Sequence, residues 1–240
     1  MKSQAVEIPV AGVTLRGDLE PAGDGSALVV FAHGSGSGRL SPRNRAVATA
    51  IRGAGIGTLL FDLLTEEEEV VDNRTARLRF DIGLLARRLE AATEWAIARN
   101  AGGRGLAVGY FGASTGAAAA LIAASRLGER IAAVVSRGGR PDLAGPFLDH
   151  VAAPTLLIVG QRDAEVIGRN EQALSQLTCE RDIAIVPRAG HLFEEPGALE
   201  EVARLATNWF HRHLPAASMV ASAVRPGGIA REHHDRRTSR

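Results

Sequence analysis

The chain has 240 residues, of which 45% are hydrophobic and 23% are charged. This length and composition predict one folded domain with a sizeable core and exclude a disordered chain. No apolar run approaches the roughly 18 residues that a membrane span needs, so we expect no membrane partner. The net charge is +1, but five arginines stand against Glu232 and Asp235 in residues 215–240, which leaves −2 for residues 1–214. A body with this charge is not expected to bind nucleic acid.

The compartment is predicted from the N-terminus and from cysteine usage. The first residues lead into an alternating, strand-like stretch and lack the apolar segment of a signal peptide. Cys179 is the single cysteine, which excludes an internal disulfide. Both features predict a cytoplasmic protein.

Two strands are expected first, over residues 5–10 and 13–19, with a hairpin turn at Ala11-Gly12. Short, continuous apolar runs then recur along the chain and are typical of strands buried on both faces. They cover residues 28–32, 57–61, 106–111, 131–135, 155–159 and 183–186.

Helical segments lie between these apolar runs. Apolar residues at steps of three and four predict helices over residues 82–96 and 199–209, and Ala-rich stretches at 42–54 and 115–127 are compatible with helix. The alternation predicts an α/β fold: a mostly parallel sheet of about eight strands with helices on both faces. The first two strands are expected to form an antiparallel edge.

Two segments interrupt the alternation. Residues 63–79 are polar and are expected to form a loop or a small excursion above the sheet, with Glu66 to Glu69 facing solvent rather than a metal ion. After Pro215 the apolar periodicity ends, so we expect a single domain over residues 1–214 and a disordered, Arg-rich tail over residues 215–240 that hydrolysis does not need. A lid or a dimer arm is the alternative for this tail.

The strongest chemical signal is Gly112-Ala113-Ser114-Thr115-Gly116, a G-x-S-x-G motif between a predicted buried strand and an Ala-rich helix. In this setting the serine sits on a sharp, strained turn. Its neighbours two positions away must be small, so that strand and helix can pass closely. Ser114 is therefore the candidate nucleophile.

A serine nucleophile needs a base, and a base needs a carboxylate that orients it. His191 follows the last predicted strand and so lies at the same sheet edge as Ser114, while His150 is a weaker candidate. Asp163 follows the preceding strand, with Glu165 as the fallback acid. The chain order Ser, Asp, His is the one expected for a nucleophile elbow of this type.

The glycine-rich segment His33-Gly34-Ser35-Gly36-Ser37-Gly38 follows the first buried strand. We expect the backbone N–H groups of Ser35 and Thr115 to form the oxyanion hole, with Gly34 as second choice for the first donor. His33 is expected to support this loop rather than to act as a base. No Gly-Lys-Ser/Thr follows the glycines, so a Walker A phosphate loop is discounted, and no Gly-x-Gly-x-x-Gly opens the helix.

With these motifs the chain resembles the α/β-hydrolase superfamily, and within it the dienelactone-hydrolase-like proteins. The resemblance covers about residues 5–214 and rests on four segments: 31–38, 112–116, 158–163 and 190–194. Dienelactone hydrolases proper carry a cysteine nucleophile where this chain has Ser114, so the resemblance implies a serine hydrolase rather than dienelactone turnover. Related domains also occur beside phosphoribosyltransferase domains.

Only about twenty residues separate the strand ending at Val135 from the strand beginning at Thr155, where many lipases insert a helical cap. The absence of a large cap implies an open site for small, soluble esters. The expected function is thus a serine esterase that works through an acyl-enzyme without metal or cofactor. A thioesterase or acyltransferase on the same triad, and a catalytically silent binding module, are the alternatives.

Three arginines follow strand ends on the predicted active-site side: Arg39, Arg137 and Arg140. They are either surface arginines with local carboxylate partners or ligands for a carboxylate or phosphate on the substrate. Arg137 is the best candidate for a ligand, because a strand end is rigid and Gly138-Gly139 leave room beside it. The expected partner is a small-molecule ester, and the sequence leaves a homodimer open.

Overall fold

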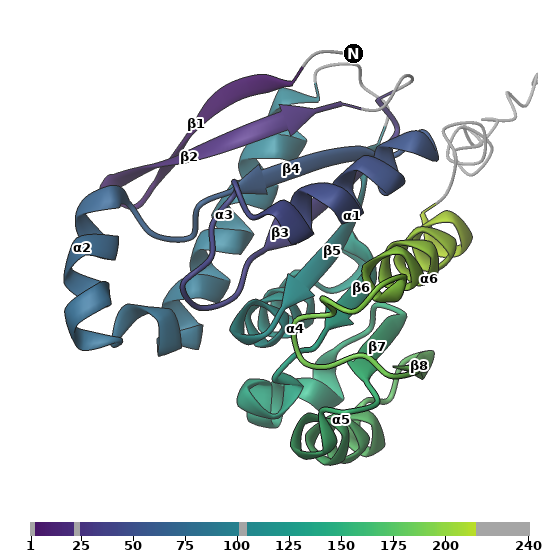
Figure 1. Ribbon diagram of the computed structural model, residues 1–240. Coiled ribbons are helices and arrows are strands. Elements are labelled where there is room, and N and C mark those ends of the chain that lie inside the picture. Colours follow the sequence, from purple (N-terminus) through teal and green to yellow (C-terminus); the bar gives the residue numbers. More distant parts are fainter. Residues whose placement is uncertain (1–2, 22–24, 101–104, 215–240) are drawn as a thin grey trace, which may run out of the picture.

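The structure, a computed structural model, describes residues 3–21, 25–100 and 105–214. Within these residues eight strands form one sheet in the order β1-β2-β4-β3-β5-β6-β7-β8 (Figure 1). The β1–β2 and β2–β4 pairs are antiparallel, and every later pair is parallel. The predicted sheet with its antiparallel edge is confirmed. The strands are β1 Gln4–Val10, β2 Val13–Glu20, β3 Ala27–Ala32, β4 Gly57–Phe61, β5 Ala107–Ala113, β6 Ile131–Arg137, β7 Thr155–Gly160 and β8 Arg181–Val186.

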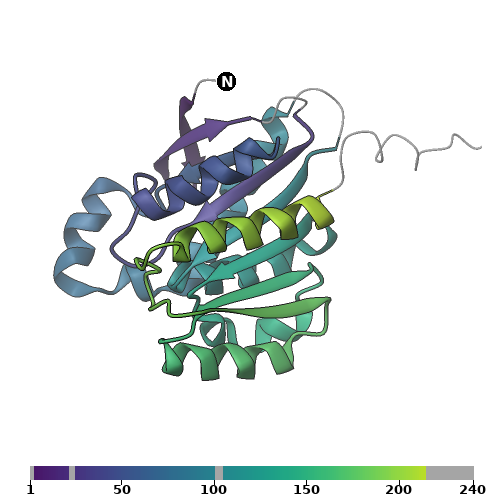
Figure 2. The same cartoon turned by 45° about the vertical axis from the view of Figure 1, so that its right-hand side comes forward.

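Helices cover both faces of this sheet because its central strands are buried on both sides. One face carries α1 (Pro42–Gly53) and α6 (Ala198–His213), which lie side by side in Figure 2. The other face carries α3 (Ile82–Arg99) and α4 (Thr115–Leu127), with η3 (Pro141–His150) and α5 (Ala164–Gln176) following toward the β8 edge. Two apolar cores result, one on each side of the sheet. These two layers hold the strand ends, and hence the loops after them, in fixed positions.

The polar segment at residues 63–79 is more ordered than the sequence suggested. It contains the helix α2 (Glu66–Thr75) and the short turn η1 (Leu78–Phe80), on the left of Figure 1. A capping box starts α2: the Thr65 hydroxyl accepts from the Glu68 N–H at 3.3 Å, and the Glu68 carboxylate accepts from the Thr65 N–H at 2.9 Å. The expectation that the whole glutamate run faces solvent is wrong for Glu68, whose carboxylate binds the buried Arg88 at 2.6 Å.

Between β6 and β7 only η3 is inserted, so the prediction of a fold without a large cap is confirmed. η3 packs against α4 and α5. Across the described residues, no helix combines the length and apolarity that a membrane crossing requires. The tail predicted for residues 215–240 lies outside the described residues.

Candidate active site

The loops that carry the candidate residues leave the sheet at one edge. β3, β5, β6, β7 and β8 run parallel, so their carboxyl ends meet there. In open α/β sheets this edge is the usual place for a ligand. Chemistry-bearing side chains from distant parts of the chain are thereby gathered in one place.

Ser114 occupies the turn between β5 and α4 in a strained backbone conformation, with φ +50° and ψ −122°. A side chain on Gly116 would collide with the Ala32 carbonyl at 2.2 Å, and one on Gly112 with the Ala117 Cα at 2.5 Å. These two glycines therefore let strand, turn and helix pass closely, as the motif predicted. Backbone strain of this kind persists where the surroundings hold it and concentrates at functional sites. The Ser114 side chain is partly exposed.

His191 and Asp163 meet although 28 residues separate them in the chain. The His191 Nδ1 lies 2.6 Å from the Asp163 Oδ2, and the Asp163 side chain is 16% exposed. The carboxylate fixes the proton of the ring on Nδ1 and leaves Nε2 as the free nitrogen. Glu165, the fallback acid, binds Arg169 at 2.6 Å instead.

Ser114 lies near His191 and Asp163 but forms no hydrogen bond with the His191 ring. Ser114 donates its backbone N–H to the Arg137 carbonyl at 3.3 Å. A side chain on the next residue, Gly138, would lie 3.7 Å from the His191 Cε1. The ring thus packs against the backbone segment that holds Ser114. No hydrogen bond joins the Ser114 hydroxyl to His191 among the described residues, and such bonds are often loose without substrate.

The two residues of the candidate oxyanion hole contact each other at the start of α4. The Ser35 hydroxyl lies 3.1 Å from the Thr115 hydroxyl, which ties the glycine-rich loop to the turn after Ser114. A side chain on Gly34 would stand 2.9 Å from the Ser114 Cβ, so the loop backbone passes directly beside Ser114. Neither the Ser35 N–H nor the Thr115 N–H donates to another group in the part of the chain that the structure describes. Two free donors beside a serine can stabilise a developing oxyanion.

His33 connects the glycine-rich loop to the loop after β4. Its Nε2 accepts from the Leu63 N–H at 2.9 Å, so the proton is on Nδ1, which lies 3.0 Å from the Gly34 carbonyl. Burial lowers the pKa of His33, against the raising effects of the Gly34 carbonyl and of Asp62. The neutral ring serves as a fixed bridge between two loops, in agreement with its expected supporting position.

A cleft of about 570 Å³ adjoins these donors. Ser35 and Thr115 line it, together with residues from the start of α1 and from α2. Among the described residues, no group of three or more His, Cys, Asp and Glu side chains could hold a metal ion. The lining of the cleft offers hydroxyl groups, backbone N–H groups and charged side chains to a ligand.

Comparison with known proteins agrees with this fold. No protein-family model matches the chain. A dienelactone hydrolase from Anabaena variabilis is 56% identical, and its structure superposes with a TM-score of 0.86 over 89% of this chain and 99% of that one. The chain belongs to the dienelactone-hydrolase-like α/β-hydrolases.

Further matches include a more distant α/β-hydrolase and two curated relatives. A lidless α/β serine hydrolase from Xanthomonas campestris shares the fold at 22% identity and a TM-score of 0.69, over 90% of this chain and 96% of that one. Curated proteins from two Mycobacterium tuberculosis strains, each named "Putative phosphoribosyl transferase", are 51% identical over 89% of this chain. The chain spans about half the length of these curated relatives, 47% in each case.

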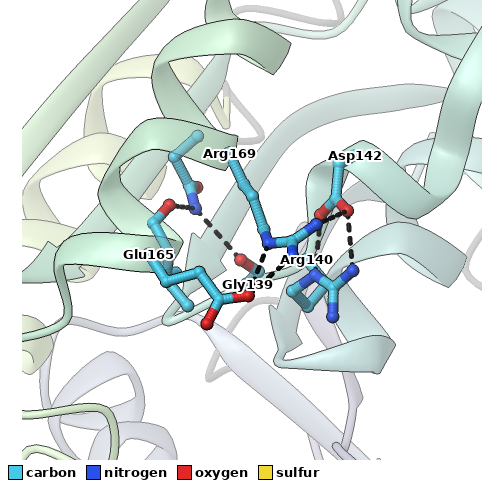
Figure 3. A network of polar contacts seen from close by, with 7 residues as sticks. Gly139, Arg140, Asp142, Glu165 and Arg169 are labelled. Atoms are coloured by element: carbon cyan, nitrogen blue, oxygen red, sulfur yellow. Dashed lines mark hydrogen bonds and ion pairs between the residues drawn. The ribbon is translucent and has the colours of Figure 1, made fainter.

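The three candidate arginines of this α/β-hydrolase differ in their partners. Arg39 pairs with Asp62 and, at 3.5 Å, with Asp18. Arg140 binds Asp142 through two bonds of 2.7 and 2.8 Å, within a network that Figure 3 shows. The same carboxylate also accepts from Arg169 at 3.2 Å, which connects η3 to α5. Only Arg137, of these three, has no carboxylate partner among the described residues.

Two residues that the sequence did not indicate also shape this edge. Glu195 accepts from the Gly190 N–H at 2.9 Å and so fixes the loop that carries His191. Arg43, in the first turn of α1, binds Glu194 at 3.0 Å from the same loop. The Arg43 contact spans 151 residues, and no local pattern could have revealed it. A carboxylate four residues after His191 was the available signal for Glu195.

Proposed function

We propose that this α/β-hydrolase is a serine esterase that cleaves small, soluble carboxylic esters. Ser114 is the nucleophile, His191 the general base and Asp163 the acid that orients it. The N–H groups of Ser35 and Thr115 form the oxyanion hole. Compartment and partner belong to the same proposal: a cytoplasmic enzyme acting on a small-molecule ester.

In the first half of the reaction, His191 Nε2 takes the proton of the Ser114 hydroxyl as its oxygen attacks the ester carbonyl. Asp163 stabilises the imidazolium that forms. The two N–H groups stabilise the negative oxygen of the tetrahedral intermediate. His191 then returns the proton to the departing alcohol, which leaves an acyl group on Ser114.

In the second half, water takes the place of the alcohol. His191 removes a proton from the water as its oxygen attacks the acyl carbonyl, and the carboxylic acid departs while Ser114 regains its proton. No electrons are transferred in either half, and every proton moves through His191.

The observation that carries this proposal is the 2.6 Å contact between His191 and Asp163, beside a serine at φ +50°. A histidine that serves only the fold rarely combines a carboxylate on one nitrogen with a free nitrogen at a strained serine turn. The name of the Anabaena variabilis relative, a dienelactone hydrolase, also supports a hydrolase. The transferase name belongs to curated proteins of about twice this length. The name does not say which half of those proteins it describes, and this chain matches only one half.

A fluorophosphonate probe and a panel of small esters with matched thioesters test the proposal. The probe should label the intact protein and spare Ser114→Ala, while Ser125→Ala, on the same α4 helix, should still react. We expect Asp163→Asn to lower kcat for esters by roughly 100- to 10,000-fold, because the His191 ring is then no longer held in the tautomer that carries its proton on Nδ1. Glu165→Gln should change kcat little.

Two results would replace this function by an alternative. No labelling of the intact protein would indicate a silent binding module. Equal labelling of the Ser114→Ala variant would show that another residue reacts, and Ser114 would no longer be the candidate nucleophile. Labelling with turnover of thioesters alone would indicate a thioesterase on the same triad.

A further inference from the structure

One short segment, residues 137–140 at the end of β6, binds the backbone of Ser114 on both sides. The Ser114 N–H donates to the Arg137 carbonyl at 3.3 Å, and the Ser114 carbonyl accepts from the Arg140 N–H at 3.1 Å. The backbone of Ser114 is strained, with φ +50°, and such a conformation persists only where its surroundings hold it. Residues 137–140 are therefore part of what keeps the candidate nucleophile in place.

The same segment lies against the loop of the candidate base. A side chain on Gly138 would stand 3.0 Å from the His191 carbonyl and 3.7 Å from the His191 Cε1. Residues 137–140 thus contact both the Ser114 turn and the His191 loop. A shift of this segment would change the distance between the two side chains that must exchange a proton.

A buried side chain connects the segment to α5. Asn170 is 0% exposed, and its Nδ2 donates to the Gly139 carbonyl at 3.0 Å and to the Val166 carbonyl at 2.7 Å. Two carbonyl oxygens surround this atom, so it must be the nitrogen of the amide. The Asn170 Oδ1 is buried and has no hydrogen-bonding partner among the described residues. The side chain therefore acts as a donor, with one acceptor in α5 and one in the segment.

The stability of α5 does not account for Asn170. Asparagine has a lower helix propensity than an apolar residue such as leucine, and a buried amide oxygen without a partner costs free energy. An apolar side chain of similar volume would avoid both costs, but it would leave the carbonyl of the buried Gly139 without this donor. The bond to Gly139 is what distinguishes asparagine from an apolar residue at this position.

The helix that carries Asn170 also begins at the candidate acid, because Asp163 is the N-cap residue of α5. Asn170 follows Asp163 by about two helical turns. At its start the helix contacts His191 through Asp163, and further along it contacts the segment that binds Ser114. One rigid element thus connects the acid to the turn of the nucleophile.

We propose that Asn170 is a positioning residue for Ser114. By donating to the Gly139 carbonyl, it fixes residues 137–140 and, through them, the strained turn of the candidate nucleophile. This inference rests on the proposed esterase function and adds a residue that touches neither the substrate nor the reacting atoms. A small displacement of reacting groups slows the chemical step strongly, so loss of this bond should lower kcat and leave KM nearly unchanged.

Two variants remove the bond in different ways. Asn170→Leu replaces the amide by an apolar side chain of similar volume. Asn170→Ser retains a donor for the Val166 carbonyl, because a serine in a helix can bond the carbonyl four residues before it, but its side chain is shorter and loses Gly139. Both variants should lower kcat for a neutral ester at least tenfold and keep KM within about threefold. Both should also slow labelling by the fluorophosphonate probe at least tenfold.

Two control variants separate positioning from a loss of stability. Leu177→Ala removes a side chain that is 1% exposed, at the opposite end of α5 from Asp163, and should lower Tm while kcat and KM stay within about threefold. Arg169→Met, next to Asn170, removes the exposed ion pair with Asp142 in the network of Figure 3 and should also keep kcat in that range. All rates are compared at a temperature at which each variant is folded.

Hydrogen exchange tests the positioning of the turn without turnover. Relative to the amides of β5, those of Ser114 and Arg140 should exchange at least tenfold faster in Asn170→Leu but not in Leu177→Ala. This result would support the positioning role even if the intact protein hydrolysed no ester, in which case only the esterase function would fail. Unchanged exchange of these two amides, an equal loss of kcat in Asn170→Leu and Leu177→Ala, or a higher KM with unchanged kcat would overturn the proposal.

Discussion

At the scale of single residues, the buried His33 connects two loops of the candidate site. His33 accepts from the Leu63 N–H and donates to the Gly34 carbonyl, and both partners are backbone groups of loops at the sheet edge. Gly34 in turn passes beside Ser114. A change at His33 should therefore reach the oxyanion hole through the backbone alone.

His33→Leu should cost about 1–3 kcal/mol in the free energy of unfolding, because a buried N–H and a buried carbonyl lose their partners. The kcat for a neutral ester should fall while KM changes less, since the donors of the oxyanion hole move. Urea unfolding and steady-state kinetics measure the two effects. His150→Leu, an exposed histidine outside the site, is the control. An unchanged kcat in a destabilised His33→Leu protein would show that His33 serves the fold only.

The same residue predicts a pH dependence of stability. The pKa of His33 is lower in the folded protein than the ordinary histidine value of 6.5, so the unfolded chain binds more protons between the two values. Stability is then complete above pH 6.5 and declines as the pH falls toward the folded pKa. Because the pKa of His213 is also lowered, by burial first, the slope must be compared between the intact protein and His33→Leu. A smaller slope below pH 6.5 in the variant is the expected outcome.

The candidate site could be predicted from the sequence where its residues follow strand ends, and not where its contacts are long-range. Ser114, Asp163 and His191 each come after an apolar run, and parallel strands bring such positions together. The contact of Arg43 with Glu194 depends on how α1 packs beside the loop before α6. Arg140 pairs with Asp142 and Arg137 does not, because only Arg140 lies within reach of that carboxylate. Spacing in the sequence alone does not decide this.

At the scale of elements, the helix α2 shows where periodicity fails as a guide. Its sequence, Glu66–Thr75, has almost no apolar face, and Val70 and Val71 are both about half exposed. Without an apolar stripe, a helix is not expected from pattern alone. Local capping at Thr65 and two ion pairs, Glu68 with the buried Arg88 and the buried Asp72 with Arg79, stabilise it instead. The capping box was the sequence signal that could have predicted this helix.

Arg88→Met should release α2 from the body of the protein. Arg88 is 5% exposed and holds the Glu68 carboxylate through two bonds of 2.6 Å, and the Leu63 carbonyl at 2.7 Å. Removing one partner of a buried pair costs roughly 3–5 kcal/mol, and we expect about 2–3 here because Glu68 is one-quarter exposed. Since α2 lines the cleft, kcat/KM should fall as well.

Hydrogen exchange resolves whether the effect of Arg88→Met is local. Amides of α2 should exchange faster in the variant, while those of α4, on the same face of the sheet, should not. Arg126→Met, which removes a more exposed arginine paired with Glu90, is the matched control and should change stability by less than about 1 kcal/mol. Equal acceleration in α2 and α4 would contradict a local anchoring effect.

At the scale of the whole molecule, the sheet and its two helix layers were the part most accessible from sequence. Strands buried on both faces appear as continuous apolar runs, and each predicted run corresponds to a strand. The order of the strands was not accessible, because β4 lies between β2 and β3 through long-range pairing. The two ends of the sheet differ: β1 pairs antiparallel, and β8 presents charged residues at its exposed start, as edge strands often do.

The domain boundary gives the last prediction, that a chain truncated after Leu214 keeps its fold and its activity. The core under α1 and α6 ends at Leu214, which is 6% exposed. Just before it, Trp209 donates to the Pro154 carbonyl at 3.2 Å, and Phe210 packs against the backbone of Gly109 in β5. These contacts bury the end of α6 against the sheet, so we expect Tm and kcat/KM for a neutral ester to match those of the full chain. A chain truncated after Asn208 is the control and should not fold, because it lacks both aromatic side chains. If the Leu214 truncation folds but loses activity, the tail acts as a lid. If it also changes its sedimentation from dimer to monomer, the tail acts as a dimer arm.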